Sequence, residues 1–339
     1  MYKRGQGRDR LLVGIYVDNL LITGADEEEI AKFKLQMKEL FKMSDLGLLT
    51  YYLGIEVQQK LGEITLCQEA YAKKILENCG MEDCNPTQVP MEPRVKLSKK
   101  SEAPAVDATE YRSVVGSLRY LVNTRPDLAY SVGIVSRYME APTTEHWAAV
   151  KHILRYIKGT TDYGIVYLKE KGKVKILGYS DSDMAGDVDD RKSTSGVAYF
   201  LGNSIVSWLS QKQKVVALSS CEAEYIAAAT AACQGVWLGR LLGDLKEEEA
   251  ERVVLNVDNK FTISLCKNPV HHDMSKHIDT RYHYIRGCVE ENKIEVNYVR
   301  TDDQLADILT KSLGRLKFLE MRRRIGVQAV KTSTSCLGG

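Results

Sequence analysis

The feature that most constrains the fold is a proline-rich segment that divides the chain into parts of different character. Four of the seven prolines lie at positions 86, 90, 93 and 104, in polar surroundings. Proline donates no backbone hydrogen bond and fixes φ, so helices and sheet ladders are interrupted there. Residues 85–108 are therefore predicted to form a linker between residues 1–84 and a helical segment at 109–162. A third part is predicted at 163–326, and a flexible Ser-, Thr- and Gly-rich tail at 327–339.

The first part begins with two strand-like runs around Asp18 and Asn19. Asp and Asn tolerate positive φ, so this pair predicts a tight hairpin turn. Asp26 with Glu29 three residues on is typical of a helix start, and apolar residues then recur at helical spacing up to Phe41. This part is therefore predicted to be a hairpin followed by an amphipathic helix.

The third part alternates between strand and helix patterns. Strand-like runs occur at 164–168, 174–180, 196–201, 204–209, 253–257 and 294–299, and helical patterns begin near Ser219, Asp279 and Asp303. Successive strands, a long helix and then strand–helix–strand–helix predict an α/β (α+β) fold, in which helices flank a mixed sheet.

Charge and cysteine content exclude several classes of protein. The net charge is only +2, so any site for a polyanion depends on local patches. Apolar runs are far shorter than 18 residues, and the basic start of the chain is unlike a secretory signal. The eight cysteines form no CxxC pair, which argues against a disulfide framework. We therefore expect an intracellular reducing compartment, cytoplasmic or nuclear, and no membrane partner.

Four carboxylates fall at the ends of predicted elements: Asp181, Glu222, Asp258 and Asp307. If they converge, their oxygens suit Mg²⁺ or Mn²⁺, and two such ions can promote phosphodiester cleavage. Each also has a structural interpretation. Ser219 and Glu222 fit a capping box, Asp258 a helix cap, Asp307 a solvated helix face and Asp181 a turn. Spacing alone favours the structural interpretations, and the coincidence of all four favours a metal site only in combination with the family resemblance given below.

Four of the six histidines lie between residues 271 and 283. No pair has the helical spacing of four residues, so a zinc site is disfavoured. A polar loop beside a phosphate-handling site and a plain solvated loop are about equally favoured. On the first interpretation Lys276, His277, Arg281 and His283 are possible substrate contacts.

Several blocks, taken in order, resemble the C-terminal part of the Pol polyprotein of Ty1/copia-type retrotransposons. The reverse transcriptase and its helical connection are resembled by residues 16–24 (YVDNLLITG), 52–57 (YLGIEV), 111–121 (YRSVVGSLRYL) and 124–128 (TRPDL). The ribonuclease H domain is resembled by residues 178–209, 219–225 (SSCEAEY), 257–259 (VDN), 275–279 (SKHID) and 305–311 (LADILTK). This resemblance implies a palm remnant at 1–84, a helical connection at 109–162 and a ribonuclease H-like domain at 163–326.

The resemblance also implies chemistry. Asp181, Glu222, Asp258 and Asp307 correspond to the acidic set that binds two Mg²⁺ ions and hydrolyses the RNA strand of RNA–DNA hybrids. Asp183 competes for the first role, and Glu224, more weakly, for the role of Glu222. The family's polymerase hairpin carries two adjacent aspartates, but here the second is Asn19 beside Asp18, and only 17 residues precede Asp18.

The chain is therefore expected to be a truncated Pol fragment that has lost polymerase activity and retains a ribonuclease H site. The alternative is a catalytically silent, vestigial or domesticated nucleic-acid-binding protein.

Overall fold

The computed structural model describes residues 2–93, 95–170, 172–267 and 280–330. The chain divides between residues 49 and 50 into two units, Met1–Leu49 and Thr50–Gly339. This differs from the division expected from the prolines, since the break comes before residues 50–84 rather than after them.

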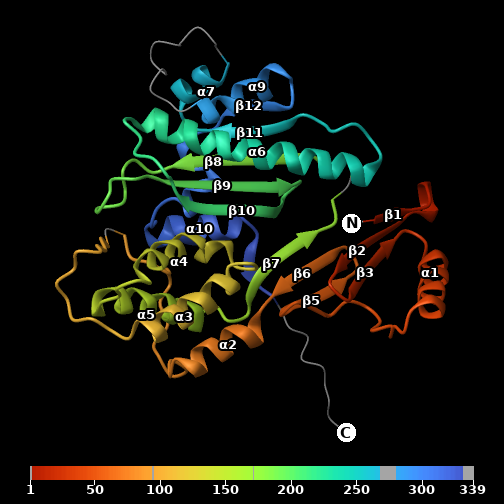
Figure 1. Ribbon diagram of the computed structural model, residues 1–339, viewed down its shortest axis with the longest axis horizontal. Coiled ribbons are helices and arrows are strands. Elements are labelled where there is room, and N and C mark those ends of the chain that lie inside the picture. Colours follow the sequence, from red (N-terminus) through yellow and green to blue (C-terminus); the bar gives the residue numbers. More distant parts are fainter. Residues whose placement is uncertain (1, 94, 171, 268–279, 331–339) are drawn as a thin grey trace. The chain divides into compact units, whose positions relative to one another are not determined.

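The first unit is a three-stranded antiparallel sheet with one helix. Its sheet has the order β1 (Tyr2–Arg4), β2 (Leu11–Tyr16), β3 (Asn19–Gly24), and the helix α1 follows (Glu27–Leu40) (Figure 1). The side chain of Asp26 accepts hydrogen bonds from the N–H groups of Glu28 and Glu29, which is the predicted cap. No residue of α1 is buried.

The predicted hairpin forms, with its turn one residue earlier than expected. Asn19 pairs with Tyr16, so the turn consists of Val17 and Asp18. The positive φ of 52° belongs to Val17 rather than to Asp18 or Asn19. The register follows from β2, where Leu11 and Val13 alternate inward.

The second unit contains two five-stranded sheets (Figure 1). The first is wholly antiparallel, in the order β13-β7-β6-β5-β4. Its strands are β4 (Tyr51–Tyr52), β5 (Ile55–Lys60), β6 (Glu63–Cys67), β7 (Tyr163–Leu168) and β13 (Val327–Ala329). Strands from three expected parts of the chain thus share one sheet. Residues 327–329, expected in a flexible tail, are an edge strand paired with β7.

Four helices lie between β6 and β7 in the sequence, and the last three make up the predicted connection. They are α2 (Glu69–Asn78), α3 (Ala108–Leu121), α4 (Ala129–Val135) and α5 (Thr144–Lys158), with 3₁₀ turns η2 (Pro126–Leu128) and η3 (Ser136–Tyr138) on either side of α4. The expected linker packs against them. Val89, Met91 and Leu97 are buried in the same apolar cluster as α3 and α5, so the expected linker contributes side chains to the core, while most of its described residues are exposed.

A buried ion pair fastens this connection to the C-terminal helix. Arg125 is 1% exposed and forms two hydrogen bonds with Asp127, at 2.9 and 2.8 Å. The Tyr156 hydroxyl donates to Asp127 at 2.6 Å and accepts from Arg322 of α10 (Arg315–Arg324) at 3.0 Å. Every charge of the cluster therefore has a partner, as burial in a low-dielectric interior requires.

The second sheet of this unit confirms the predicted α/β class. Its order is β10-β9-β8-β11-β12, with antiparallel pairs among β8 (Ile176–Ser182), β9 (Thr194–Leu201) and β10 (Ser204–Lys212). The strands β11 (Val253–Val257) and β12 (Ile294–Tyr298) continue it in parallel with β8. The remaining elements are α6 (Ser220–Lys246), α7 (Lys260–Lys267), η4 (Thr280–His283), α9 (Tyr284–Glu290), η5 (Thr301–Asp303) and η6 (Leu305–Leu309).

Both faces of this sheet are covered. Alternate residues of β9 point to opposite faces, and all but the last are buried. Val197 and Tyr199 pack with α6, which crosses the sheet in Figure 1. Ala198 and Phe200 belong to the cluster that contains the connection helices. The connection thus supplies one of the two layers that bury the sheet.

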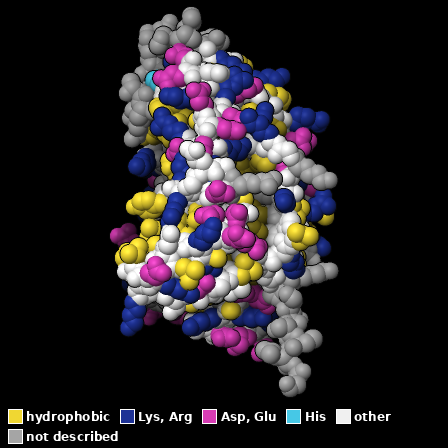
Figure 2. Space-filling view, turned by 90° about the vertical axis from the view of Figure 1, so that its right-hand side faces the viewer, with side chains coloured by type: hydrophobic (Ala, Val, Ile, Leu, Met, Phe, Trp, Pro, Cys, Tyr) yellow, Lys and Arg dark blue, Asp and Glu magenta, His cyan; other side chains and the backbone are white. Residues whose placement is uncertain are grey.

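Surface charge is mixed. On the face drawn in Figure 2, Lys and Arg side chains are interspersed with Asp and Glu side chains among the coloured residues, in keeping with the net charge of +2. Among the described residues, no helix is both long and apolar enough to cross a membrane.

Candidate active site

Asp181 and Asp307 meet at the centre of the second sheet. Asp181 lies in β8 opposite Gly196 of β9 and is 3% exposed. The Thr310 hydroxyl donates a hydrogen bond to its Oδ2 atom. Asp307, on η6, is 4% exposed, and burial together with the charge of Asp181 raises the pKa of Asp307 to about 7. The two carboxylates thus share one buried environment.

Lys311 supplies the positive charge nearest to these two aspartates. Its Nζ atom lies 2.8 Å from Asp307 Oδ1 and 3.6 Å from Asp181 Oδ2. Burial alone would lower the pKa of Lys311, but the two aspartates outweigh it and raise the pKa. The pair of carboxylates is therefore held together by an internal cation.

Asp258 follows β11 and reaches the same group through Gln304. The fully buried Gln304 amide donates to the Ser180 carbonyl at 2.9 Å and lies 3.5 Å from Asp258 Oδ1. Its own oxygen accepts from the N–H of Ala306 at 3.2 Å. One amide thus ties the ends of β8 and β11 to the start of η6.

Two glutamates in the first turns of α6 have different surroundings. Ser219 caps the helix, accepting from the Glu222 N–H at 3.1 Å, and Glu222 Oε2 accepts from the Leu218 N–H at 2.8 Å. Ser219 therefore caps the helix as the structural interpretation expected, but Glu222 accepts from Leu218, one residue before the cap, and not from the Ser219 N–H of a full capping box. Glu224 lies two residues further along α6, about 200° around the helix axis from Glu222.

Glu224 is the glutamate that shares the environment of the aspartates. Asn259, next to Asp258, donates to Glu224 Oε1 at 3.2 Å. Burial, followed by the charge of Asp258 and then that of Asp181, raises the pKa of Glu224 to about 8. Its Oε2 atom is buried and accepts no hydrogen bond from the residues that the structure describes. The structure therefore brings together Asp181, Glu224, Asp258 and Asp307.

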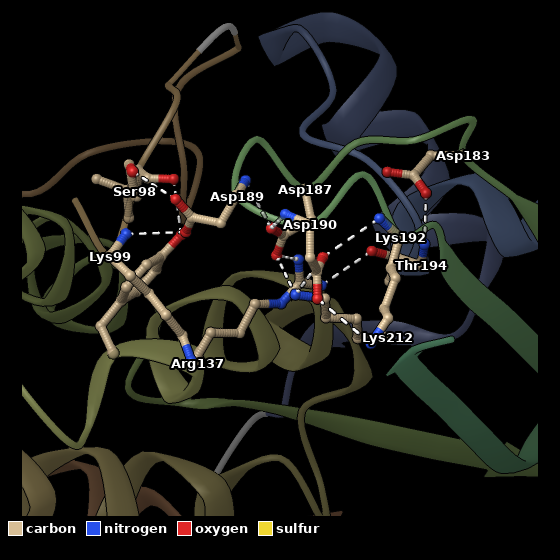
Figure 3. Close-up of polar contacts among 12 residues, drawn as sticks. Ser98, Lys99, Arg137, Asp183, Asp187, Asp189, Asp190, Lys192, Thr194 and Lys212 are labelled. Carbon is tan, nitrogen blue, oxygen red and sulfur yellow. Dashed lines mark hydrogen bonds and ion pairs between the residues drawn. The ribbon is translucent and has the colours of Figure 1, made fainter. Parts of the chain in front are cut away.

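Asp183, the competitor for the first role, is engaged in its own loop. Its Oδ1 atom accepts from the Thr194 N–H, and burial raises its pKa to about 6 (Figure 3). A Cβ at Gly186 would fall 1.8 Å from its Oδ2 atom. The loop therefore closes tightly on this carboxylate, which would have to move to admit a side chain at position 186.

The same loop is anchored to the connection by Asp187. Arg137 and Lys212 contact Asp187 Oδ2 at 3.0 and 2.6 Å (Figure 3). Burial alone would raise the pKa of Asp187, but Lys212 and two backbone N–H groups outweigh it and lower the pKa well below its usual range. Asp189 accepts from the Ser98 hydroxyl at 2.5 Å and from the Lys99 N–H at 2.8 Å. The expected linker and connection thus hold the loop that follows Asp181.

The expected substrate contacts are only partly within the described residues. Lys276 and His277 lie outside them, as does the side chain of Arg281. His283 Nδ1 lies 3.0 Å from the hydroxyl of Tyr225, so this half-buried imidazole packs against α6. In the first unit, the Asn19 amide donates to Asp18 Oδ1 at 3.2 Å, and both side chains are exposed.

The four carboxylates fit a divalent metal by their chemistry, although they do not form a finished cage. Within residues 2–93, 95–170, 172–267 and 280–330, no three His, Cys, Asp or Glu side chains are already arranged to hold a metal ion. Carboxylate oxygens are nevertheless the ligands that Mg²⁺ and Mn²⁺ prefer. Burial and like charge raise the pKa values of Glu224 and Asp307, and Glu224 Oε2 accepts no hydrogen bond from the described residues, so a cation bound here would favour their charged forms.

Sequence reasoning assigned no role to four residues that orient these carboxylates: Asn259, Gln304, Thr310 and Lys311. Three of them lie in the blocks VDN and LADILTK, each of which contains an acidic candidate. Membership of these blocks is the signal that could have found them. Gln304 precedes the second block by one residue and carries no comparable signal.

Comparisons with known proteins agree with this architecture. Residues 1–93 match the family reverse transcriptase (RNA-dependent DNA polymerase). The chain is 41% identical over 333 residues to the retrovirus-related Pol polyprotein from transposon RE2 of Arabidopsis thaliana, covering 98% of this chain and 23% of that protein. It is 30% identical over 231 residues to a transposon Ty5-1 protein of Saccharomyces cerevisiae, covering 67% of this chain and 75% of that protein.

Among solved structures, the N-terminal ribonuclease H domain from Mycobacterium tuberculosis, fused to maltose binding protein, aligns with 44% of this chain and 98% of that one. The identity is 15% and the TM-score 0.30. With identities near 40% over almost its whole length, the chain belongs to the family of retrovirus-related Pol polyproteins from copia-type transposons.

Proposed function

We propose that the second unit hydrolyses the RNA strand of RNA–DNA hybrids, with divalent metal ions held by Asp181, Glu224, Asp258 and Asp307. The supporting observation is that carboxylates from four elements, β8, α6, the end of β11 and η6, act electrostatically on one another. Residues so far apart in sequence come together only through the tertiary fold. Like charges gathered in this way are typical of a metal-dependent phosphodiester site.

Glu224 takes the role for which the sequence favoured Glu222. Glu222 is engaged at the start of α6 through Leu218 and Ser219. Glu224 instead accepts from Asn259 and keeps one buried oxygen without a hydrogen bond. A carboxylate that is oriented by one donor and open on its other oxygen is suited to bind a cation.

Mg²⁺ or Mn²⁺ bound here would activate a water molecule and stabilise the leaving oxygen of the phosphodiester. The protein's own contribution is to orient the ligands. Thr310 fixes one oxygen of Asp181, Asn259 fixes one oxygen of Glu224, and Gln304 holds the segment that carries Asp258. Preorganisation of this kind removes reorganisation cost at the moment of reaction.

The proposed substrate follows from the family. A hybrid presents 2′-hydroxyl groups in a wide, shallow minor groove, and double-stranded DNA does not. The first unit is proposed to lack polymerase activity, because Asn19 offers a neutral amide where the family's hairpin has a second aspartate. Its Asp18 is exposed and paired with that amide.

The test is hybrid cleavage by the full chain. Purified protein with Mg²⁺ or Mn²⁺ should cut the RNA strand of a labelled hybrid, spare double-stranded DNA, and stop on addition of EDTA. Asp181→Asn should lower the rate by about a hundredfold or more, the scale of losing a preorganised electrostatic group. A folded protein that binds the hybrid but leaves it uncut with either metal would favour the silent nucleic-acid-binding alternative.

A further inference from the structure

We infer that Lys311 is a place-holder cation, which neutralises Asp181 and Asp307 when no metal is bound and competes with metal for the site. The inference rests on the metal site of the proposed function and concerns how readily that site is loaded. Its basis is that one ammonium group contacts two carboxylates of the set, at 2.8 and 3.6 Å.

The backbone of Lys311 is held in place, whereas its ammonium group can move. Its N–H donates to the Asp307 carbonyl at 3.3 Å, at the end of η6. The side chain is 42% exposed, whereas those of Asp181 and Asp307 are 4% and 6% exposed. The ammonium can therefore move into water by side-chain rotation alone, while the carboxylates stay in place. Long lysine side chains with hydrated heads are suited to such movement.

Electrostatic repulsion explains why Lys311 and a metal ion would not occupy the site together. Two buried carboxylates without a cation repel each other, so the metal-free fold needs the charge of Lys311. A divalent cation at the same carboxylates would be repelled by an ammonium a few ångströms away. The two cations therefore exclude each other, and part of the metal's binding energy is used to displace Lys311.

The arrangement differs from an ordinary surface ion pair. Both acceptors are almost fully buried, so solvent screens the interaction less than at the surface. The partners are also two of the proposed ligands themselves. Lys311 thus keeps the two carboxylates together when no metal is bound. It also raises the concentration of metal that is needed to fill the site.

The test compares Lys311→Met with Lys317→Met in the full chain, using Mn²⁺ as the probe. Lys317 lies on the neighbouring α10, 3.9 Å from Glu320, and its removal changes the net charge equally. Titration calorimetry should show Mn²⁺ binding at least about tenfold tighter in Lys311→Met than in wild type. Lys317→Met should bind like wild type.

Thermal unfolding supplies the second readout. In EDTA, Lys311→Met should melt below wild type, and saturating Mn²⁺ should abolish most of that difference. Weaker or equal Mn²⁺ binding by Lys311→Met, or a melting difference that persists in Mn²⁺, would overturn the inference. If wild type itself bound no Mn²⁺, the proposed metal site would fail instead, so the two failures are distinguishable.

Discussion

The side-chain amide of Asn259 donates to Glu224 Oε1 at 3.2 Å and thereby joins the segment after β11 to the first turns of α6. Asp258 lies next to Asn259 and acts on the same glutamate through its charge. This relationship identifies which of two glutamates, two residues apart on one helix, faces the aspartates.

Exchange of each glutamate for its amide separates their roles. Glu224→Gln should lower metal-dependent hybrid cleavage by about a hundredfold or more, because a ligand charge is lost. Glu222→Gln keeps an oxygen for the Leu218 N–H, so its rate should stay within a few-fold of wild type, and its stability should change by less than about 0.5 kcal/mol. The measurement is single-turnover cleavage of a labelled hybrid. An active Glu224→Gln with an inactive Glu222→Gln would return the role to Glu222.

The metal-free protein should lose stability as pH rises from about 5 to 8.5. The pKa of Asp307 is raised to about 7 and that of Glu224 to about 8, whereas both carboxyls ionise near 4 in the unfolded chain. Between these values the folded state keeps protons that the unfolded state has released, so rising pH favours unfolding. Melting temperatures in EDTA should fall across this range.

Two comparisons check the origin of that pH dependence. Asp307→Asn and Glu224→Gln should each give a shallower decline in EDTA, since each removes one titrating group. Because metal binding requires deprotonated carboxylates, the rise in melting temperature on adding Mg²⁺ should grow with pH. A flat profile in EDTA would show that these carboxyls ionise at ordinary pKa values in the fold.

The anchor of the loop after Asp181 should contribute strongly to stability. Asp187→Asn replaces a buried carboxylate that contacts Arg137 and Lys212, and should lower the free energy of unfolding by about 3 kcal/mol. Asp190→Asn is the matched control, because that carboxylate is 39% exposed and its pairs with Lys192 and Lys212 should contribute less than about 1 kcal/mol. Urea unfolding measures both. Equal effects would mean that the buried cluster adds nothing beyond a surface pair.

Limited proteolysis should cut first between residues 41 and 50 rather than in the proline-rich segment. Residues 41–50 form no helix and are mostly exposed, and they precede the break between the two units. Residues 85–108 are held by buried Val89 and Leu97 and by the Tyr138 hydroxyl, which donates to the Leu97 carbonyl at 2.8 Å. Mass spectrometry of early fragments decides between the two segments. A first cut within 85–108 would contradict the packing described for it.

Fragments of the chain should fold only if they keep the apolar cluster that the connection shares with the second sheet. A chain of residues 50–339 keeps the apolar cluster that joins the connection to the second sheet, and should fold. A chain of residues 160–326 loses the connection helices, which cover one face of that sheet, and also loses β13. It should be aggregated or molten by circular dichroism and gel filtration, since a large apolar face would be exposed. Cooperative unfolding of the shorter fragment would contradict the shared core.

Local sequence was sufficient for what depends on neighbouring residues. Strand β11 lies at its predicted residues, helix α5 lies within the predicted helical segment, and the mixed α/β sheet was predicted from the order of the strand and helix patterns. Hydrophobic period and caps determine such elements, because both act over a few residues. The ordered sequence blocks likewise indicated the family, and they marked Asp181, Asp258 and Asp307.

Long-range packing decided the rest. Four prolines indicated a linker, but burial of Val89, Met91 and Leu97 makes that segment part of the core. In sequence, Ser219 and Glu222 matched a helix cap better than a metal site by their spacing alone, and Glu224 was the weaker candidate for the metal ligand. Only the fold brings Asn259 and Asp258 against α6, and only the fold places Lys311 between acceptors 130 and four residues earlier in the chain. Charges and packing across such separations have no local sequence pattern, so the tertiary structure alone determines which carboxylates meet.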